Sequence, residues 1–164
     1  HGGTALSRDW FIISTQTGVR FSDFKKIMNA PLIPVDGGFD ISIGTQKTKT
    51  PVVIPVSKLL FDVLKRYDFR VPPPPSNPKY NKALKDIAER AGISKKITSH
   101  TGRKTFCTNM YLKGVPVPFI MKISAHKSER VFYKYIGVSL TENAALVRNS
   151  VSDFKIEVPM KIAN

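Results

Sequence analysis

Apolar residues recur at helical spacing through most of the chain. The spacing predicts helices over residues 7–17, 21–28, 99–113, 118–123, 129–136 and 141–151, and two further helices with Ser57 and Asn77 as their N-caps. Gly18, Gly92 and Gly114 each follow such a stripe, where helices commonly stop. The run of four prolines at 72–75 predicts an extended surface connection between helices.

Residues 38–56 follow a different period. Phe39, Ile41 and Ile43 alternate with polar residues, and Val52, Val53 and Ile54 follow after a short polar stretch. This pattern predicts an antiparallel hairpin with residues 46–50 at or near its turn. The expected fold class is therefore mainly α with a small antiparallel β-sheet (α+β), in one domain, since 164 residues are too few for two ordinary domains.

Charge narrows the classes of partner. Twenty-six Lys and Arg against twelve Asp and Glu give a formal net charge of +14. Such a balance favours nucleic acid, and less often an anionic membrane surface, as the partner. No apolar run approaches the ~20 residues that span a bilayer. The single cysteine, Cys107, excludes an internal disulfide and fits a reducing cytosol.

Chemistry-bearing residues occur in three separated boxes. The first is Thr17-Gly18-Val19-Arg20-Phe21-Ser22-Asp23, and the second is His100-Thr101-Gly102-Arg103, whose imidazole and guanidinium share one face of a helix. In the third, His126 precedes Tyr135 by nine residues. Taken singly, each residue is more often an ordinary surface or packing side chain. The ordered set is not readily explained that way.

These boxes, together with Lys47-Thr48 in the expected hairpin, resemble those of the tyrosine recombinases, or phage-type integrases. The resemblance runs from about Leu6 to Val147 and is greatest to integrases of conjugative transposons. It implies a tyrosine recombinase catalytic fold over residues 1–150. It also implies that residues 151–164 form a tail that family members exchange between protomers. The family's N-terminal core-binding domain is not expected within these residues.

The resemblance also implies a role for each matched residue. Arg20 and Arg103 would clamp the scissile phosphate, and Tyr135 would attack it to form a 3′-phosphotyrosyl intermediate. Lys47 would protonate the leaving 5′-oxygen, and Asp23 would help to fix Arg20. His100 would assist proton transfer, and His126 would hydrogen-bond the phosphate.

The residue types suit this chemistry. Two guanidiniums offer permanently charged, bidentate donors to the non-bridging oxygens. A tyrosine hydroxyl, with an ordinary pKa of ~10, needs a base or a positive field to become a good nucleophile. Because cationic side chains stabilise the charge, no metal or other cofactor is expected, and the sequence has no metal-ligand motif.

Several alternatives stay open at this stage. Lys49 competes with Lys47 as the hairpin lysine, and Tyr133 competes with Tyr135, although the spacing from His126 favours Tyr135. Ala125 replaces the glycine that usually precedes the third-box histidine, and the turn tolerates alanine unless the position needs a positive φ.

Other classes of function share part of the pattern. A type IB topoisomerase has the same chemistry, and a non-catalytic DNA-binding module would explain the charge alone. A metal-dependent transposase is a weaker alternative, because the scattered carboxylates of this chain offer no evident candidates for the acidic triad of such an enzyme.

The expected function is integration or excision of a mobile genetic element by site-specific DNA recombination. The expected partners are double-stranded DNA, further copies of the full-length protein in a tetramer, and accessory DNA-bending proteins, with no membrane. The resemblance implies a bacterial protein of the cytoplasm, associated with the nucleoid.

Overall fold

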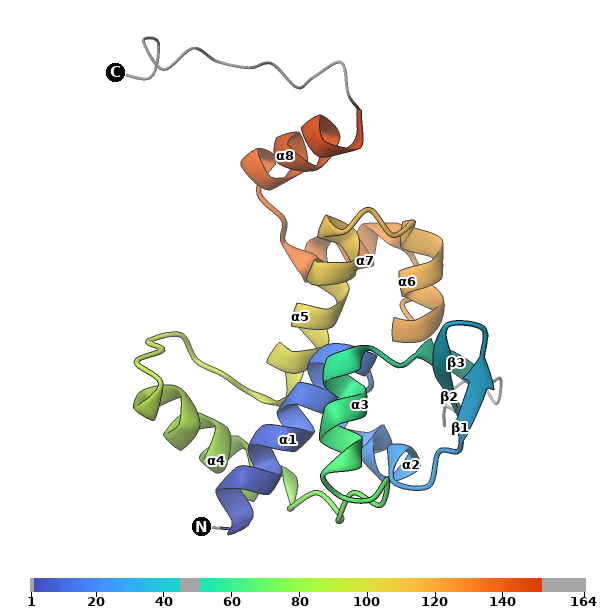
Figure 1. The fold of residues 1–164 in the computed structure, drawn as a ribbon. Helices are drawn as coiled ribbons and strands as arrows, with labels where there is room; N and C mark the ends of the chain where they lie inside the picture. The colour runs from blue at the N-terminus through green and yellow to red at the C-terminus, as the bar shows by residue number, and fades with distance from the viewer. Residues whose placement is uncertain (1, 45–50, 152–164) are drawn as a thin grey trace, which may run out of the picture.

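The computed structural model describes residues 2–44 and 51–151. Helices make up most of this part, and a small sheet lies along one side (Figure 1). In chain order the elements are α1 (Gly2–Thr17), the 3-10 turn η1 (Phe21–Asp23), α2 (Phe24–Ile27), β1 (Leu32–Val35), β2 (Gly38–Gly44), β3 (Pro51–Pro55), α3 (Lys58–Lys65), α4 (Asn77–Arg90), α5 (Ser99–Leu112), α6 (Val117–Ser124), α7 (Glu129–Ile136) and α8 (Leu140–Ser150).

The predicted fold class is confirmed, and several elements differ from the prediction in detail. α1 begins at Gly2, five residues before the predicted start at Ser7. The N-cap of α4 is Ser76 rather than Asn77, and the Oδ1 of Asn77 instead accepts a hydrogen bond from Asn81 Nδ2 at 2.6 Å.

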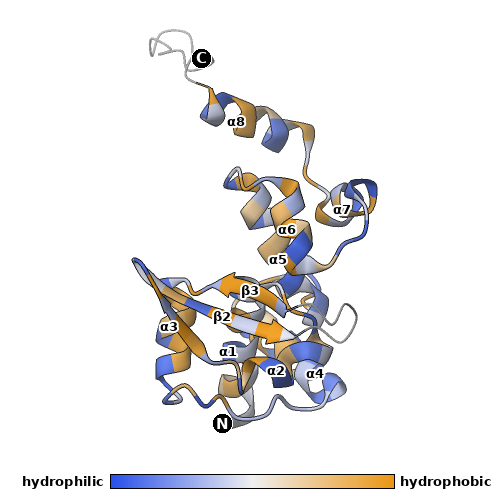
Figure 2. Ribbon diagram, turned by 90° about the vertical axis from the view of Figure 1, so that its right-hand side faces the viewer, coloured by the Kyte–Doolittle hydropathy of each residue, from blue (hydrophilic) through white to orange (hydrophobic). Residues whose placement is uncertain are grey.

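The sheet has a third strand that the sequence pattern did not predict. Its order is β1-β2-β3, all antiparallel, with Leu32 opposite Ile41 and Ile41 opposite Ile54. β1 contains Pro34, which argues against a strand in sequence analysis but is tolerated at a sheet edge. Figure 2 faces the sheet and shows α6, α7 and α8 above it.

Two clusters of buried apolar side chains stabilise the fold. The larger one lies around α1, the sheet, α3 and α4, and includes Trp10, Ile13, Phe24, Ile41, Ile54, Leu60, Val63, Tyr80 and Leu84. The smaller one lies between α5, α6 and α7, and includes Phe106, Cys107, Ile120, Phe132 and Ile136. Ile123 packs against both, so that α6 connects the two clusters.

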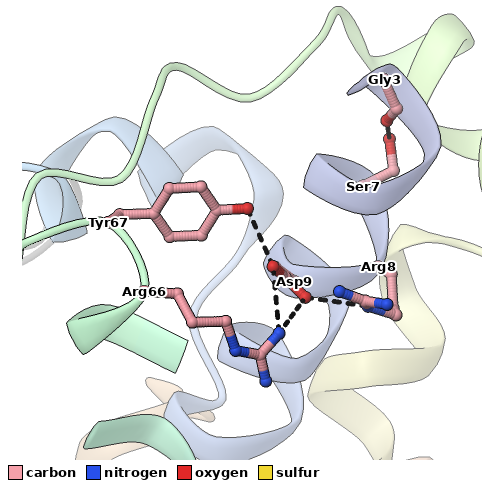
Figure 3. Close-up of polar contacts among 6 residues, drawn as sticks. All are labelled: Gly3, Ser7, Arg8, Asp9, Arg66 and Tyr67. Atoms are coloured by element: carbon pink, nitrogen blue, oxygen red, sulfur yellow. Dashed lines mark hydrogen bonds and ion pairs between the residues drawn. The ribbon is translucent and has the colours of Figure 1, made fainter. Parts of the chain in front are cut away.

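A buried carboxylate fixes α1 against the end of α3. The Asp9 side chain is 3% exposed and accepts hydrogen bonds from Arg8 Nε at 2.9 Å, Arg66 Nη1 at 3.2 Å and Tyr67 Oη at 2.8 Å (Figure 3). Charge-assisted hydrogen bonds of this kind are stronger than neutral ones. They compensate for burying the carboxylate and hold α1 against the residues that follow α3.

α1 and α5 cross at very short distance. A Cβ on Gly102 would lie 2.7 Å from Ser14 Oγ and 2.9 Å from Ser14 Cβ. Only glycine at position 102 allows this approach, which brings the beginning of α5 beside the end of α1. The crossing therefore places the first and second boxes of the sequence next to each other.

We predict that Gly102→Ala lowers the free energy of unfolding by about 1–3 kcal/mol, the usual effect of overpacking. In a Ser14→Gly background the same substitution should cost less, because the clashing atoms are gone. Gly3→Ala is the matched control. Its Cβ would meet no atom within 4 Å, and alanine favours a helix, so stability should rise slightly. Urea denaturation of the four variants measures this, and equal costs for Gly102→Ala in both backgrounds would contradict it.

Candidate active site

Arg103 lies in the second turn of α5 and is buried, with 5% of its surface exposed. Its Nη1 donates a hydrogen bond to the carbonyl of Gly18 at 2.6 Å, and its Nη2 donates to the carbonyl of Ser124. Burial, and then the charge of Arg20, lower the pKa of Arg103 from 12.5. A guanidinium stays protonated in proteins, so the site contains a buried cation that forms no ion pair with a carboxylate among the residues that the structure describes.

Arg20 lies just beyond the end of α1, in extended backbone before η1. Gly18, with φ +65°, ends the helix and turns the chain toward α5. The charge of Arg20 lowers the pKa of Arg103, His126 and Tyr135, so all four groups lie close together. The first arginine therefore faces the same region as the second.

Asp23 does not pair with the side chain of Arg20 in the described part of the chain. Its carboxylate forms an ion pair with Lys26 Nζ at 3.0 Å, and its backbone N–H donates to the carbonyl of Arg20 at 2.9 Å. Asp23 thus contacts Arg20 through the backbone. The electrostatic repulsion between Arg20 and Arg103 is only partly offset, because the carboxylate is shared with Lys26.

His126 and Tyr135 stand next to each other on the other side of Arg103. Their ring centroids are 4.8 Å apart, and Nδ1 of His126 lies 2.8 Å from Ser124 Oγ. Burial, followed by the charges of Arg103 and Arg20, lowers the pKa of His126 below 6.5. The imidazole is therefore neutral at pH 7.

Tyr135 is half-buried, and its hydroxyl donates weakly to the carbonyl of His100 at 3.5 Å. Burial raises the pKa of Tyr135 above 10.0, while the charge and hydrogen bond of Arg103, together with the charge of Arg20, act in the opposite direction. The side chains of Tyr135 and His100 line one groove of about 470 Å³, with Lys95, Lys96 and Lys104 along it. A polyanion is the ligand that such a groove attracts.

Tyr133 points away from this site. It is 44% exposed, and its ring packs edge-on against Tyr111 at 5.9 Å. Residues two apart on a helix are about 200° apart around the axis. α7 therefore directs Tyr135 toward Arg103 and Tyr133 toward Tyr111 of α5.

The structure brings together Arg20, His100, Arg103, His126 and Tyr135, with Asp23 nearby. The two candidate hairpin lysines, Lys47 and Lys49, lie outside the described residues. The strands on either side are described. Gly44 pairs with Pro51, so the two residues that flank positions 45–50 lie opposite each other in the sheet.

Sequence reasoning missed two of the contacts that shape the site. One is the carbonyl of Gly18, which accepts from Arg103 across 85 positions. The other is Ser124, which contacts both Arg103 and His126. The sequence contains no signal that marks a particular backbone carbonyl. A signal did mark Ser124, because it is a polar residue at the end of an apolar helix.

Within residues 2–44 and 51–151, no group of three or more His, Cys, Asp or Glu is arranged to bind a metal ion. In the same part of the chain, no helix has the length and apolar character to cross a membrane.

Comparison with known families gives one match. A model of the phage integrase family matches residues 72–142, the part that contains His100, Arg103, His126 and Tyr135. A comparison with curated protein sequences gives no significant match.

Solved structures of similar fold come from site-specific recombinases. The XerH recombinase bound to palindromic difH substrate, in a post-cleavage complex, aligns with a TM-score of 0.68 at 15% identity, over 87% of this chain and 45% of XerH. The Tn1549 transposon integrase bound to transposon right-end DNA gives 0.57 at 16% identity, over 88% of this chain and 58% of the integrase. The catalytic domain of bacteriophage HP1 integrase gives a TM-score of 0.58 at 20% identity, over 90% of this chain and 84% of the HP1 domain. This chain thus spans about half the length of the first two.

One residue of the site has a strained backbone. Ala125, the C-cap of α6, has φ 48° and ψ 40°, so the position does need the left-handed conformation that glycine adopts freely. In an L-residue with a Cβ this conformation costs roughly 1–2 kcal/mol. The alanine therefore reduces stability directly beside His126.

We predict that Ala125→Gly raises the free energy of unfolding by about 0.5–1 kcal/mol, which is the strain relieved less the entropy of glycine in the unfolded chain. Ala91→Gly is the matched control, because Ala91 is also a helix C-cap but has φ −86°. That substitution should lower stability or leave it unchanged. Urea titrations of both variants measure the difference, and a loss of stability in Ala125→Gly would contradict the strain.

Proposed function

We propose that this chain, a member of the tyrosine recombinase family, cleaves and rejoins double-stranded DNA through a covalent bond between Tyr135 and a DNA 3′-phosphate. The observation that carries the proposal is the juxtaposition of the buried Arg103, which donates to the carbonyls of Gly18 and Ser124, with the half-buried Tyr135. A cation without a paired carboxylate favours an anion, and the tyrosine beside it is the one nucleophile of the proposed reaction.

Cleavage begins with the scissile phosphate between Arg20 and Arg103. The hydroxyl oxygen of Tyr135 attacks phosphorus as its proton passes to His100, which lines the same groove. The bond to the 5′-oxygen breaks, and a lysine of the 45–50 segment, Lys47 or Lys49, protonates that oxygen. The two guanidiniums and an N–H of His126 stabilise the charge on the non-bridging oxygens.

Rejoining reverses these steps on a second DNA strand. A 5′-hydroxyl attacks the phosphotyrosyl phosphorus and loses its proton to the lysine, and the bond to Tyr135 breaks as the tyrosine regains a proton. Bond energy is conserved in the phosphotyrosine, so the reaction needs no external energy source. Cationic side chains fulfil the role of a metal ion, and the proposed reaction uses none.

The nucleophile and the arginines act from the same chain. Tyr135 is close to Arg103 and His126 of its own chain, and α7 is joined to α6 by only a few residues. This arrangement supports cleavage in cis, with each protomer cutting the strand that its own arginines bind.

The DNA complexes of XerH and the Tn1549 integrase support DNA as the substrate. By the same analogy, the full-length protein would integrate or excise a mobile element. It would act as a tetramer on DNA, with DNA-bending proteins as accessories, at the bacterial nucleoid.

α8 supports assembly with further copies of the chain. No residue of α8 is buried, Leu140 is 88% exposed, and the helix stands apart from the rest of the fold (Figure 1). Its contact with α5 includes the hydrogen bond from Tyr111 Oη to Asn143 at 2.9 Å. Exposed apolar side chains on such a helix favour packing against a neighbouring protomer. The tail after Val151, which we expected to be exchanged, lies outside the described residues.

We predict that duplex DNA binding weakens steeply with salt. The logarithm of the association constant should fall with the logarithm of salt concentration at a slope of about −0.9 for each phosphate neutralised. Lys96→Ala, in the groove with Tyr135, should reduce that slope by about 1. Arg90→Ala removes the same charge beside Arg8, at the opposite end of α1 from Arg20, and should leave the slope unchanged. Fluorescence anisotropy titrations measure it, and equal slopes for all three proteins would argue against the groove as a DNA contact.

We predict that Tyr135→Phe abolishes the covalent DNA adduct and leaves DNA affinity nearly unchanged. The substitution removes the single oxygen that bonds to phosphorus and keeps the ring that packs on His126. A denaturing gel with labelled DNA, nicked near the scissile phosphate, measures the adduct.

Tyr133→Phe is the matched control, since it removes the same atom from the opposite side of α7 and should retain cleavage. An adduct that survives in Tyr135→Phe would exclude this nucleophile, and absence of any adduct with wild-type protein would exclude the proposed function. Strand exchange between two DNA sites distinguishes a recombinase from a type IB topoisomerase, which only relaxes supercoils.

A further inference from the structure

Ser124 is the last residue of α6 and is completely buried. Its hydroxyl oxygen lies 2.8 Å from Nδ1 of His126, and its carbonyl accepts a hydrogen bond from Arg103. One small residue therefore contacts both the buried arginine and the neighbouring histidine. An apolar helix end would serve packing equally well, so the hydroxyl calls for another explanation.

The state of the His126 ring makes this contact consequential. Burial and the two arginines lower the pKa of His126, so its imidazole carries a single N–H at neutral pH. If that proton is on Nδ1, the remaining ring nitrogen can only accept hydrogen bonds and would repel a phosphate oxygen. If it is on Nε2, the ring can donate to the phosphate. The tautomer thus decides whether His126 contributes to the site.

The surroundings of Ser124 favour the second arrangement. Burial, the largest effect, raises the pKa of the nearby Cys107 thiol, so the thiol stays protonated, and Ser124 acts in the opposite direction. A protonated thiol sulfur is a weak acceptor, so Nδ1 of His126, at 2.8 Å, is the better acceptor for the proton of the buried Ser124 hydroxyl. Nδ1 of His126 must then accept, and its ring proton lies on Nε2.

We propose that Ser124 is a positioning residue whose hydroxyl donates to Nδ1 of His126, which makes Nε2–H the donor for the scissile phosphate. This inference rests on the proposed function for its purpose and on the contacts of Ser124 for its geometry. The carbonyl of the same residue orients Arg103. Two phosphate-binding groups on different helices are therefore aligned by a single residue at the end of α6.

The hydrogen bond can be tested without DNA by long-range ¹H–¹⁵N correlation NMR of the histidine rings. The chain has three histidines, His1, His100 and His126, and the signals lost in His126→Gln assign the ring of interest. We expect a single Nε2–H tautomer with a hydrogen-bonded Nδ1 in the wild type. In Ser124→Ala, the Nδ1 resonance should move toward the position of an unbonded ring nitrogen.

Ser128→Ala is the matched control. It removes a serine hydroxyl two residues beyond His126, where it accepts from the backbone N–H of Val131 and caps α7. It should lower stability and leave the His126 ring signals unchanged. An Nδ1–H tautomer in the wild type, or an unchanged Nδ1 resonance in Ser124→Ala, would overturn the proposal.

The second readout is the single-turnover rate of adduct formation. Ser124→Ala should slow it by roughly tenfold, the effect of one neutral hydrogen bond. Ser124→Thr, which keeps the hydroxyl, should restore most of the rate, and a wild-type rate in Ser124→Ala would overturn the positioning role. If wild-type protein forms no adduct, the recombinase function fails, whereas the NMR spectra still decide the hydrogen bond.

Discussion

The buried guanidinium of Arg103 is the interaction on which the site depends. It binds the carbonyl that ends α1 and the carbonyl that ends α6, and it does so from α5, which packs against both. A buried charge is costly unless it is well hydrogen-bonded, so the fold must present these two carbonyls together. The same requirement restricts two glycines. Gly102 permits the close crossing of α5 with α1, and Gly18 provides the turn whose carbonyl Arg103 binds.

Two carbonyls do not neutralise a charge. Arg20 adds a second cation to the same region, and the carboxylate of Asp23 is shared with Lys26. The free protein therefore stores electrostatic repulsion that a phosphodiester relieves on binding. The same repulsion, together with burial, holds His126 neutral. A net charge of +14 attracts polyanions generally, whereas in the proposed reaction this local excess of positive charge binds one phosphate.

The sequence predicted those features that depend on local periodicity. The bounds of α7 agree with the prediction, and helical spacing explains why Tyr133 and Tyr135 face opposite ways. The sequence pattern did not predict β1. Pro34 disfavours a strand except at a sheet edge, and whether a strand lies at an edge depends on the tertiary structure. The bond from Arg103 to Gly18 spans 85 positions and ends on a backbone atom, which no side-chain pattern encodes. The sequence indicated that alanine at position 125 is unfavourable if the residue needs a positive φ. Only the backbone of the folded protein shows that it does.

The pKa of Tyr135 bears on the order of events in cleavage. Burial raises it, and the two arginines offset that effect while the site is empty. Once a phosphate lies between the arginines, its negative charge cancels much of their field at the tyrosine, and ionisation becomes harder rather than easier. The hydroxyl must then lose its proton during attack, to a base within reach, instead of before it. In the proposed reaction His100, which lines the groove, accepts that proton, whereas His126, with its Nδ1 bonded to Ser124, donates to the phosphate. The proposed roles of the two histidines therefore differ, because His100 receives the proton and His126 binds the oxygen.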